Sequence, residues 1–123
     1  MALILFVDDE ELTLKLLKQA AAILGHKAIT ASSQEEALAL AESHSPDLIL
    51  TDVNLNGSRS FGMIERLTQQ EKTRHIPVLT LSALAPEEVE TMARRSGAVA
   101  TLSKPIRLQN LLTTIQRYTP SKN

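Results

Sequence analysis

Short apolar runs alternate along the chain with longer stretches in which apolar residues recur every three or four positions. Five runs predict β-strands: Leu3–Val7, Lys27–Ala31, Asp47–Val53, Pro77–Ser82 and Val99–Leu102. The first, third and fourth are almost wholly apolar, as strands covered on both faces are. The second is more polar, which favours a position at an edge of the sheet.

The longer stretches have helical periodicity and carry helix start and stop signals. Gly25 and Gly97 stand where a glycine commonly ends a helix. Pro86 suits a first helical position, and Ser33 with Glu36 forms a capping-box pattern. We therefore expect helices near 10–24, 33–41, 61–67, 86–96 and 108–115. The apolar side chains expected in the core from these helices include Leu12, Leu16, Leu17, Ala20, Ile23, Leu24, Met63 and Met92.

Strict alternation of strand and helix predicts an α/β fold of (βα)₅ type. Right-handed crossovers would wind helices onto both faces of a five-stranded parallel sheet, giving a doubly wound, three-layer sandwich. The 123 residues suit one domain. We expect it to span 1–119, with the polar residues 120–123 as a flexible tail or the start of a linker.

The composition is that of an ordinary globular chain and narrows the function classes. With 13 basic and 14 acidic residues and 2% aromatic residues, the sequence gives no sign of a nucleic-acid surface. The absence of cysteine removes disulfides and thiolate metal sites. No apolar run is long enough to span a membrane, and no basic stretch precedes the first one, so a cytoplasmic location is expected.

Polar side chains that could do chemistry follow four of the five strands. Asp8 and Asp9 follow the first strand, and Asp52, Ser82 and Lys104 stand at the ends of the third, fourth and fifth. In a doubly wound sheet the carboxyl ends of the strands carry the functional groups. Three carboxylates suit a hard cation such as Mg²⁺ or Mn²⁺, and a carboxylate can itself accept a phosphoryl group. Lysine and serine could then contact phosphate oxygens.

These residues stand in the segments FVDDEE, LTDVN, LSA and SKP, which resemble the receiver domains of two-component response regulators. The resemblance covers nearly the whole chain in order and implies a flavodoxin-like, CheY-like fold. It also implies a phosphoacceptor switch, which is no enzyme beyond its own phosphorylation and dephosphorylation. The donor would be a sensor histidine kinase or a phosphotransfer protein.

Each matching residue takes a role from this resemblance. Asp52 matches the phosphoacceptor, while Asp8 and Asp9, with the backbone carbonyl of Asn54, match the Mg²⁺ ligands. Lys104 matches the lysine of the family motif. Ser82 matches the hydroxyl that moves toward the phosphoryl group. Glu10 and Glu11 are left to the helix start, where the helix dipole favours acidic residues.

Three departures from the family pattern carry consequences. The usual proline after the acceptor is replaced by Asn56, within an Asn-Gly turn signal, which predicts either a more mobile loop or one that presents Arg59 to a partner. The switch position, usually aromatic, holds Thr101, so output could run through other contacts or be weakly coupled to Ser82. Asn54 and Leu84 stand where the family tunes hydrolysis, and they predict an intermediate lifetime for the aspartyl phosphate.

Other readings stay open at this point. A receiver that binds partners without using phosphate is one. A haloacid-dehalogenase-type phosphatase is disfavoured, because its second aspartate would fall at Asn54. The output partner, or an output domain on a longer chain, is unknown. We expect a monomer or a weak phosphorylation-dependent dimer, formed through the last two helices and the strand between them.

Overall fold

The computed structural model describes residues 1–119, so the predicted tail at 120–123 lies outside the described residues. Its seven strands are β1 (Leu3–Val7), β2 (Lys27–Ala31), β3 (Leu48–Asp52), β4 (Asn54–Leu55), β5 (Ser58–Arg59), β6 (Val78–Ser82) and β7 (Ala100–Ser103). Its five helices are α1 (Glu11–Ile23), α2 (Gln34–His44), α3 (Phe61–Gln69), α4 (Pro86–Ser96) and α5 (Leu108–Tyr118).

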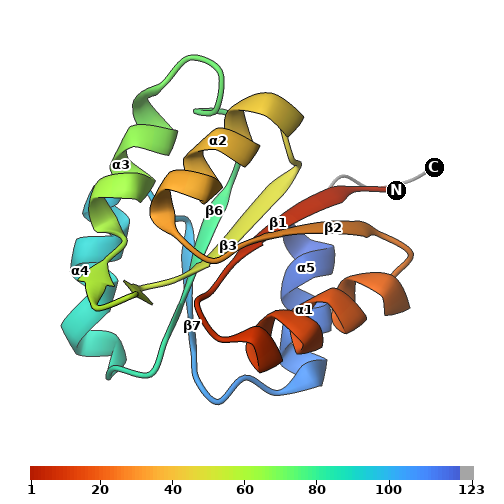
Figure 1. Cartoon of the computed structure of the whole chain (residues 1–123). Coiled ribbons are helices and arrows are strands. Elements are labelled where there is room, and N and C mark those ends of the chain that lie inside the picture. The colour runs from red at the N-terminus through yellow and green to blue at the C-terminus, as the bar shows by residue number, and fades with distance from the viewer. Residues whose placement is uncertain (120–123) are drawn as a thin grey trace.

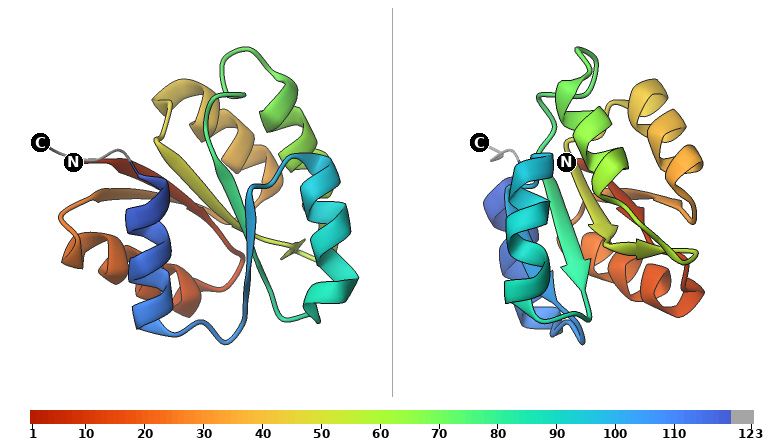
Figure 2. Two further views of the ribbon diagram at one scale, coloured as in Figure 1. Left: turned by 180° about the vertical axis from the view of Figure 1, so that it is seen from behind. Right: turned by 90° about the vertical axis from the view of Figure 1, so that its left-hand side faces the viewer.

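Five of the strands form one parallel sheet in the order β2-β1-β3-β6-β7, and helices cover both of its faces (Figures 1 and 2). The predicted α/β sandwich is therefore confirmed. The polar strand β2 does lie at an edge. The five predicted strands agree with the observed ones to within one residue at each end.

The two faces of the sheet have separate cores, because neighbouring residues of a strand point to opposite sides. On β1, Ile4 and Phe6 pack with α1 and α5, whereas Leu5 and Val7 pack with α2, α3 and α4. All four side chains are fully buried. This packing fixes the orientation of each strand and therefore the position of the residue that follows it.

The predicted capping signals at the end of α1 and the start of α2 are confirmed, whereas α2 and α5 extend three residues beyond the expected ranges. At the end of α1, Gly25 N–H donates to Ala22 O and His26 N–H to Ala21 O, which is the Schellman pattern. At the start of α2, Ser33 Oγ accepts from Glu36 N, as the capping box predicts. The Glu36 carboxylate reaches Ser32 N, one residue before the N-cap.

Three side chains predicted for the core are exposed. Leu12, Ile23 and Met92 have 82%, 62% and 46% of their surface accessible. The buried face of α1 is Leu17, Ala20 and Ala21. Helical geometry places Leu12 and Ile23 roughly a third of a turn away from Leu17, so they lie on the flank of the helix.

No helix within residues 1–119 is long and apolar enough to cross a membrane.

The short strands β4 and β5, which the sequence did not predict, form an antiparallel hairpin immediately after β3. Its two-residue turn is the predicted Asn56-Gly57, with φ of 53° and 83°.

Candidate functional site

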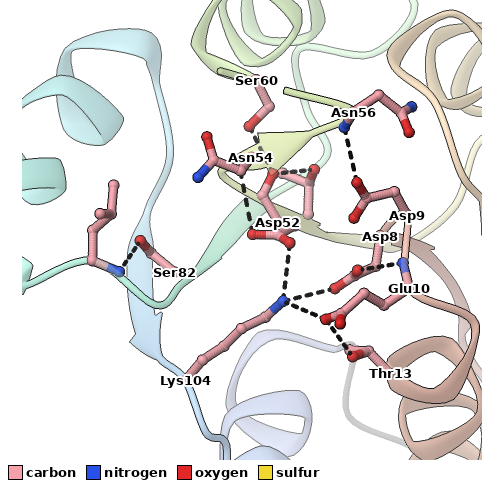
Figure 3. Close-up of polar contacts among 12 residues, drawn as sticks. Asp8, Asp9, Glu10, Thr13, Asp52, Asn54, Asn56, Ser60, Ser82 and Lys104 are labelled. Carbon is pink, nitrogen blue, oxygen red and sulfur yellow. Dashed lines mark hydrogen bonds and ion pairs between the residues drawn. The ribbon is translucent and has the colours of Figure 1, made fainter. Parts of the chain in front are cut away.

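The residues predicted for the site come together at the carboxyl edge of the sheet (Figure 3). One carboxylate oxygen each from Asp8, Asp9 and Asp52 lies within 4.8 Å of the others. Lys104 reaches the same group from the end of β7. Strands far apart in the sequence therefore deliver one continuous cluster of charged side chains.

The position of this cluster follows from the sheet topology. β1 lies between β2 and β3, so the chain reverses its direction of winding there. Such switch points leave a crevice at the carboxyl ends of the strands. Val7 pairs with Thr51, which sets Asp8 and Asp52 side by side. Asp8 N–H also donates to Ala31 O, which holds Asp8 at the end of the β1–β2 ladder.

The three carboxylates differ in burial. Asp8 is fully buried and Asp52 is 8% exposed, whereas Asp9 is exposed. Burial disfavours the charged form and raises the pKa of the Asp8 carboxyl above its ordinary value. The Glu10 N–H and Lys104 act in the opposite direction without cancelling this effect. A bound cation would therefore stabilise the charged form of the Asp8 carboxylate.

Lys104 supplies one positive charge to this cluster. Its Nζ lies 2.9 Å from Asp52 Oδ2, 3.0 Å from Asp8 Oδ2 and 3.9 Å from Glu10 Oε1. Burial by itself lowers the pKa of the ammonium group, but the hydrogen bonds and charges of Asp52 and Asp8 outweigh it, so the pKa is raised. Lys104 stays charged at neutral pH. Three aspartates and Glu10 lie around this single lysine, so the cluster holds more acidic than basic side chains.

The donor set fits a hard divalent cation. Closely spaced carboxylate oxygens are the ligands that Mg²⁺ accepts, and it keeps several waters, so the exposed side of Asp9 leaves room for them. A divalent cation would offset part of this excess of acidic side chains. Asn54, whose backbone carbonyl the family resemblance assigns to this site, is exposed and lies in β4, two residues after Asp52.

Ser82 lies on the same edge at the end of β6 and is buried. Its Oγ accepts a hydrogen bond from Leu84 N at 3.0 Å (Figure 3). Among the described residues it makes no hydrogen bond to Asp52. Thr101, one strand further, accepts a 3.0 Å hydrogen bond from the buried Thr80 Oγ1. The switch position is therefore tied to β6 by a hydroxyl pair.

Sequence reasoning missed three contributors to the site. Ser60 Oγ donates to Asp52 O at 2.8 Å and so fixes the backbone of the acceptor position. Asn56 N–H donates to Asp9 Oδ2 at 2.9 Å. Glu10, assigned only to the helix start, also lies near Lys104. The Asn-Gly turn could be predicted from the sequence, but its hydrogen bond to Asp9 could not.

Comparisons with known proteins agree with the fold and identify the family. The family model of the response regulator receiver domain matches residues 4–116. The polar-differentiation response regulator DivK of Brucella ovis is 36% identical over 115 residues, covering 94% of each chain. The chemotaxis response regulator CheY4 of Vibrio cholerae has a TM-score of 0.89 at 30% identity, covering 96% of this chain and 98% of that one.

The fold is also found within a longer protein. NtrX from Brucella abortus matches with a TM-score of 0.86 and 28% identity over 95% of this chain, but the match covers 26% of the NtrX chain. The family match and the DivK identity confirm what the four sequence segments predicted. The chain belongs to the response regulator receiver domains of two-component signalling.

Proposed function

We propose that this receiver accepts a phosphoryl group on Asp52 in a Mg²⁺-dependent reaction and thereby changes which partner it binds. The observation that carries the proposal is the geometry around Asp52. Its Oδ2 lies 2.9 Å from Lys104 Nζ, and its carboxylate belongs to the three-aspartate cluster. A histidine kinase or a phosphotransfer protein would present the donor as a phosphohistidine.

The chemistry is a displacement at phosphorus. A carboxylate oxygen of Asp52 forms the new O–P bond, the P–N bond to the histidine breaks, and the imidazole leaves with the bond electrons. Phosphoryl transfer depends on positioning and on neutralising the equatorial oxygens. Bound Mg²⁺ would supply that neutralisation together with Lys104, whose Nζ donates to Asp52 Oδ2. Asp8, Asp9 and the Asn54 carbonyl would hold the metal.

Ser82 would then respond to the new phosphoryl group. Its hydroxyl now accepts from Leu84 N, and in the phosphorylated state it would donate to a phosphoryl oxygen. That exchange would move the loop between β6 and α4. The side chains of Met92, Val99 and Leu108, on or beside α4, β7 and α5, are large, apolar and exposed. They support docking, or weak dimerisation, on the α4–β7–α5 side in the cytoplasm.

The test uses Mg²⁺ with acetyl phosphate, and separately with beryllofluoride, on wild type and Asp52→Asn. We expect a labile adduct by intact mass on wild type alone. Beryllofluoride should shift NMR signals around Asp52 and Ser82, and the spread toward Thr101 measures the coupling to β7. No adduct on wild type, or an equal adduct on Asp52→Asn, would contradict the proposal.

Phosphate-independent partner binding is the second candidate. Two observations favour it: Thr101 is held by Thr80, and no aromatic side chain stands at that position. It would be supported if a partner bound wild type and Asp52→Asn with equal affinity, with and without beryllofluoride.

A further inference from the structure

The hairpin β4–β5 reaches back to the aspartate cluster through one residue. Asn56 has a φ of 53°, a left-handed conformation that asparagine tolerates better than other non-glycine residues. In this conformation its backbone N–H donates to Asp9 Oδ2 at 2.9 Å (Figure 3). The two residues are 47 positions apart in the sequence.

The same residue also ties the hairpin to a third loop. Asn56 Nδ2 donates to Ser32 O at 3.1 Å, in the connection between β2 and α2. A second bond joins the hairpin to the first residue of α2, from Gln34 Nε2 to Arg59 O at 3.2 Å. The turn is therefore fixed from two sides, by the backbone of the β2–α2 connection and by the carboxylate of Asp9.

We propose that Asn56 is a positioning residue for the metal ligand Asp9. The inference rests on the proposed Mg²⁺ site and adds a residue to it. Asp8 is buried and held by Glu10 N–H and Lys104, so its carboxylate has a fixed orientation. Asp9 is exposed, and its only hydrogen bond within residues 1–119 comes from Asn56. Without that bond the Asp9 side chain would have to be ordered by the metal itself.

One bond of this kind supports metal binding without blocking it. A carboxylate has two oxygens and about four lone-pair sites, so a single N–H leaves acceptor capacity for a cation. Partners that orient a ligand in this way commonly change metal affinity by about 10- to 100-fold. Proline, the usual residue of the family at this position, has no N–H and could not make the bond.

The inference also couples the metal to the hairpin. Because Asn56 N–H and the cation would share one carboxylate, metal binding should restrict the Asn56-Gly57 turn. It should also restrict Arg59, which is exposed at the base of the hairpin. The hairpin would then report metal occupancy beside the β2–α2 connection, to which it is bonded.

The first test measures Mg²⁺ affinity by calorimetry in the absence of any phosphodonor. We expect Asn56→Pro, which removes the donor and fixes φ at about −65° in place of 53°, to weaken binding by about tenfold or more. Asn56→Gly keeps the N–H and the positive φ but loses the tie to Ser32, so its loss should be smaller. Ser58→Ala, an exposed change in the same hairpin, is the matched control and should bind as wild type does.

The second test needs no change in the turn. Hydrogen exchange of the Asn56 amide is followed by NMR in wild type and in Asp9→Ala. We expect faster exchange in Asp9→Ala, and slower exchange in wild type when Mg²⁺ is added. Equal exchange in the two proteins, or Mg²⁺ affinity in Asn56→Pro that is unchanged or tighter, would overturn the inference. A chain that binds Mg²⁺ but takes no phosphoryl group would overturn the proposed function and leave this inference standing.

Discussion

Asp8 is a fully buried carboxylate whose raised pKa makes it a source of instability. A pKa raised by folding means that the folded chain binds the proton more tightly than the unfolded chain does. Between the ordinary aspartate pKa of about 3.9 and the higher pKa of folded Asp8, stability therefore falls as pH rises. Above that window the full cost of the charged form is present.

Asp8→Asn should consequently stabilise the metal-free protein at pH 7, because the amide resembles the protonated carboxyl. The gain in unfolding free energy over wild type should grow with pH across the window and then stay constant. Urea unfolding at a series of pH values in EDTA measures it. Asp47→Asn is the control: this exposed carboxylate at the opposite edge accepts a hydrogen bond from Leu3 N, so its loss should bring no gain. A less stable Asp8→Asn at pH 7 would contradict the argument.

The element scale begins with the end of α4, where backbone conformation and packing act on the same residue. Gly97 has a φ of 112°, and an added Cβ would lie 2.6 Å from Thr68 Cγ2 and Oγ1 on α3. Gly25, at the end of α1, also has a positive φ, but nothing lies within 4 Å of its Cβ position. The two glycines therefore separate conformational strain from steric overlap.

Gly25→Ala should cost about 1–2 kcal/mol of stability, the strain of a left-handed conformation alone. Gly97→Ala should cost more, by roughly 1–3 kcal/mol, because α3 and α4 must also move apart. Thermal or urea unfolding of the two variants measures the difference. Equal losses would show that Thr68 gives way without cost.

The pairing of β6 and β7 includes the hydroxyl pair Thr80–Thr101. Thr80 is fully buried, so Thr101→Val would leave its hydroxyl without this acceptor, at a cost of about 1–3 kcal/mol. Thr80→Val together with Thr101→Val should recover part of that loss, because both partners are then apolar. A double-mutant cycle in urea gives the coupling between them. A coupling near zero would mean that the pair does not hold the two strands.

Some features of the fold and the site could be predicted from the sequence, and others could not. Strand ends are local features, so the positions of Asp8, Asp52 and Lys104 followed from where apolar runs stop. The exposure of Leu12 and Met92 did not, because periodicity gives the width of an apolar face but not the rotation of the helix against the sheet. The bond between Asn56 and Asp9 depends on how two loops meet across β1 and β3, and one sequence does not contain that geometry.

At the scale of the whole molecule, the fold collects three mutually repelling carboxylates at one edge of the sheet. Packing in the two hydrophobic cores fixes the strands that carry these aspartates. It therefore holds the carboxylates together against their mutual repulsion. Lys104 offsets only part of the charge. The folded state therefore brings together a carboxylate cluster that could hold a divalent cation, and the unfolded chain lacks this cluster.

Mg²⁺ should thus stabilise the whole domain against unfolding. A ligand that binds only the folded state adds RT ln(1 + [L]/Kd), about 2.7 kcal/mol at a concentration 100 times the Kd. The melting temperature should rise by several degrees with Mg²⁺ and return when EDTA removes it. KCl at matched ionic strength is the control, since screening acts on all surface charges while coordination acts only on this cluster. Asp9→Asn should remove most of the Mg²⁺ response and keep the KCl response. If KCl raised the melting temperature as much as Mg²⁺ did, the aspartates would be responding to screening, and the edge would not be a metal site.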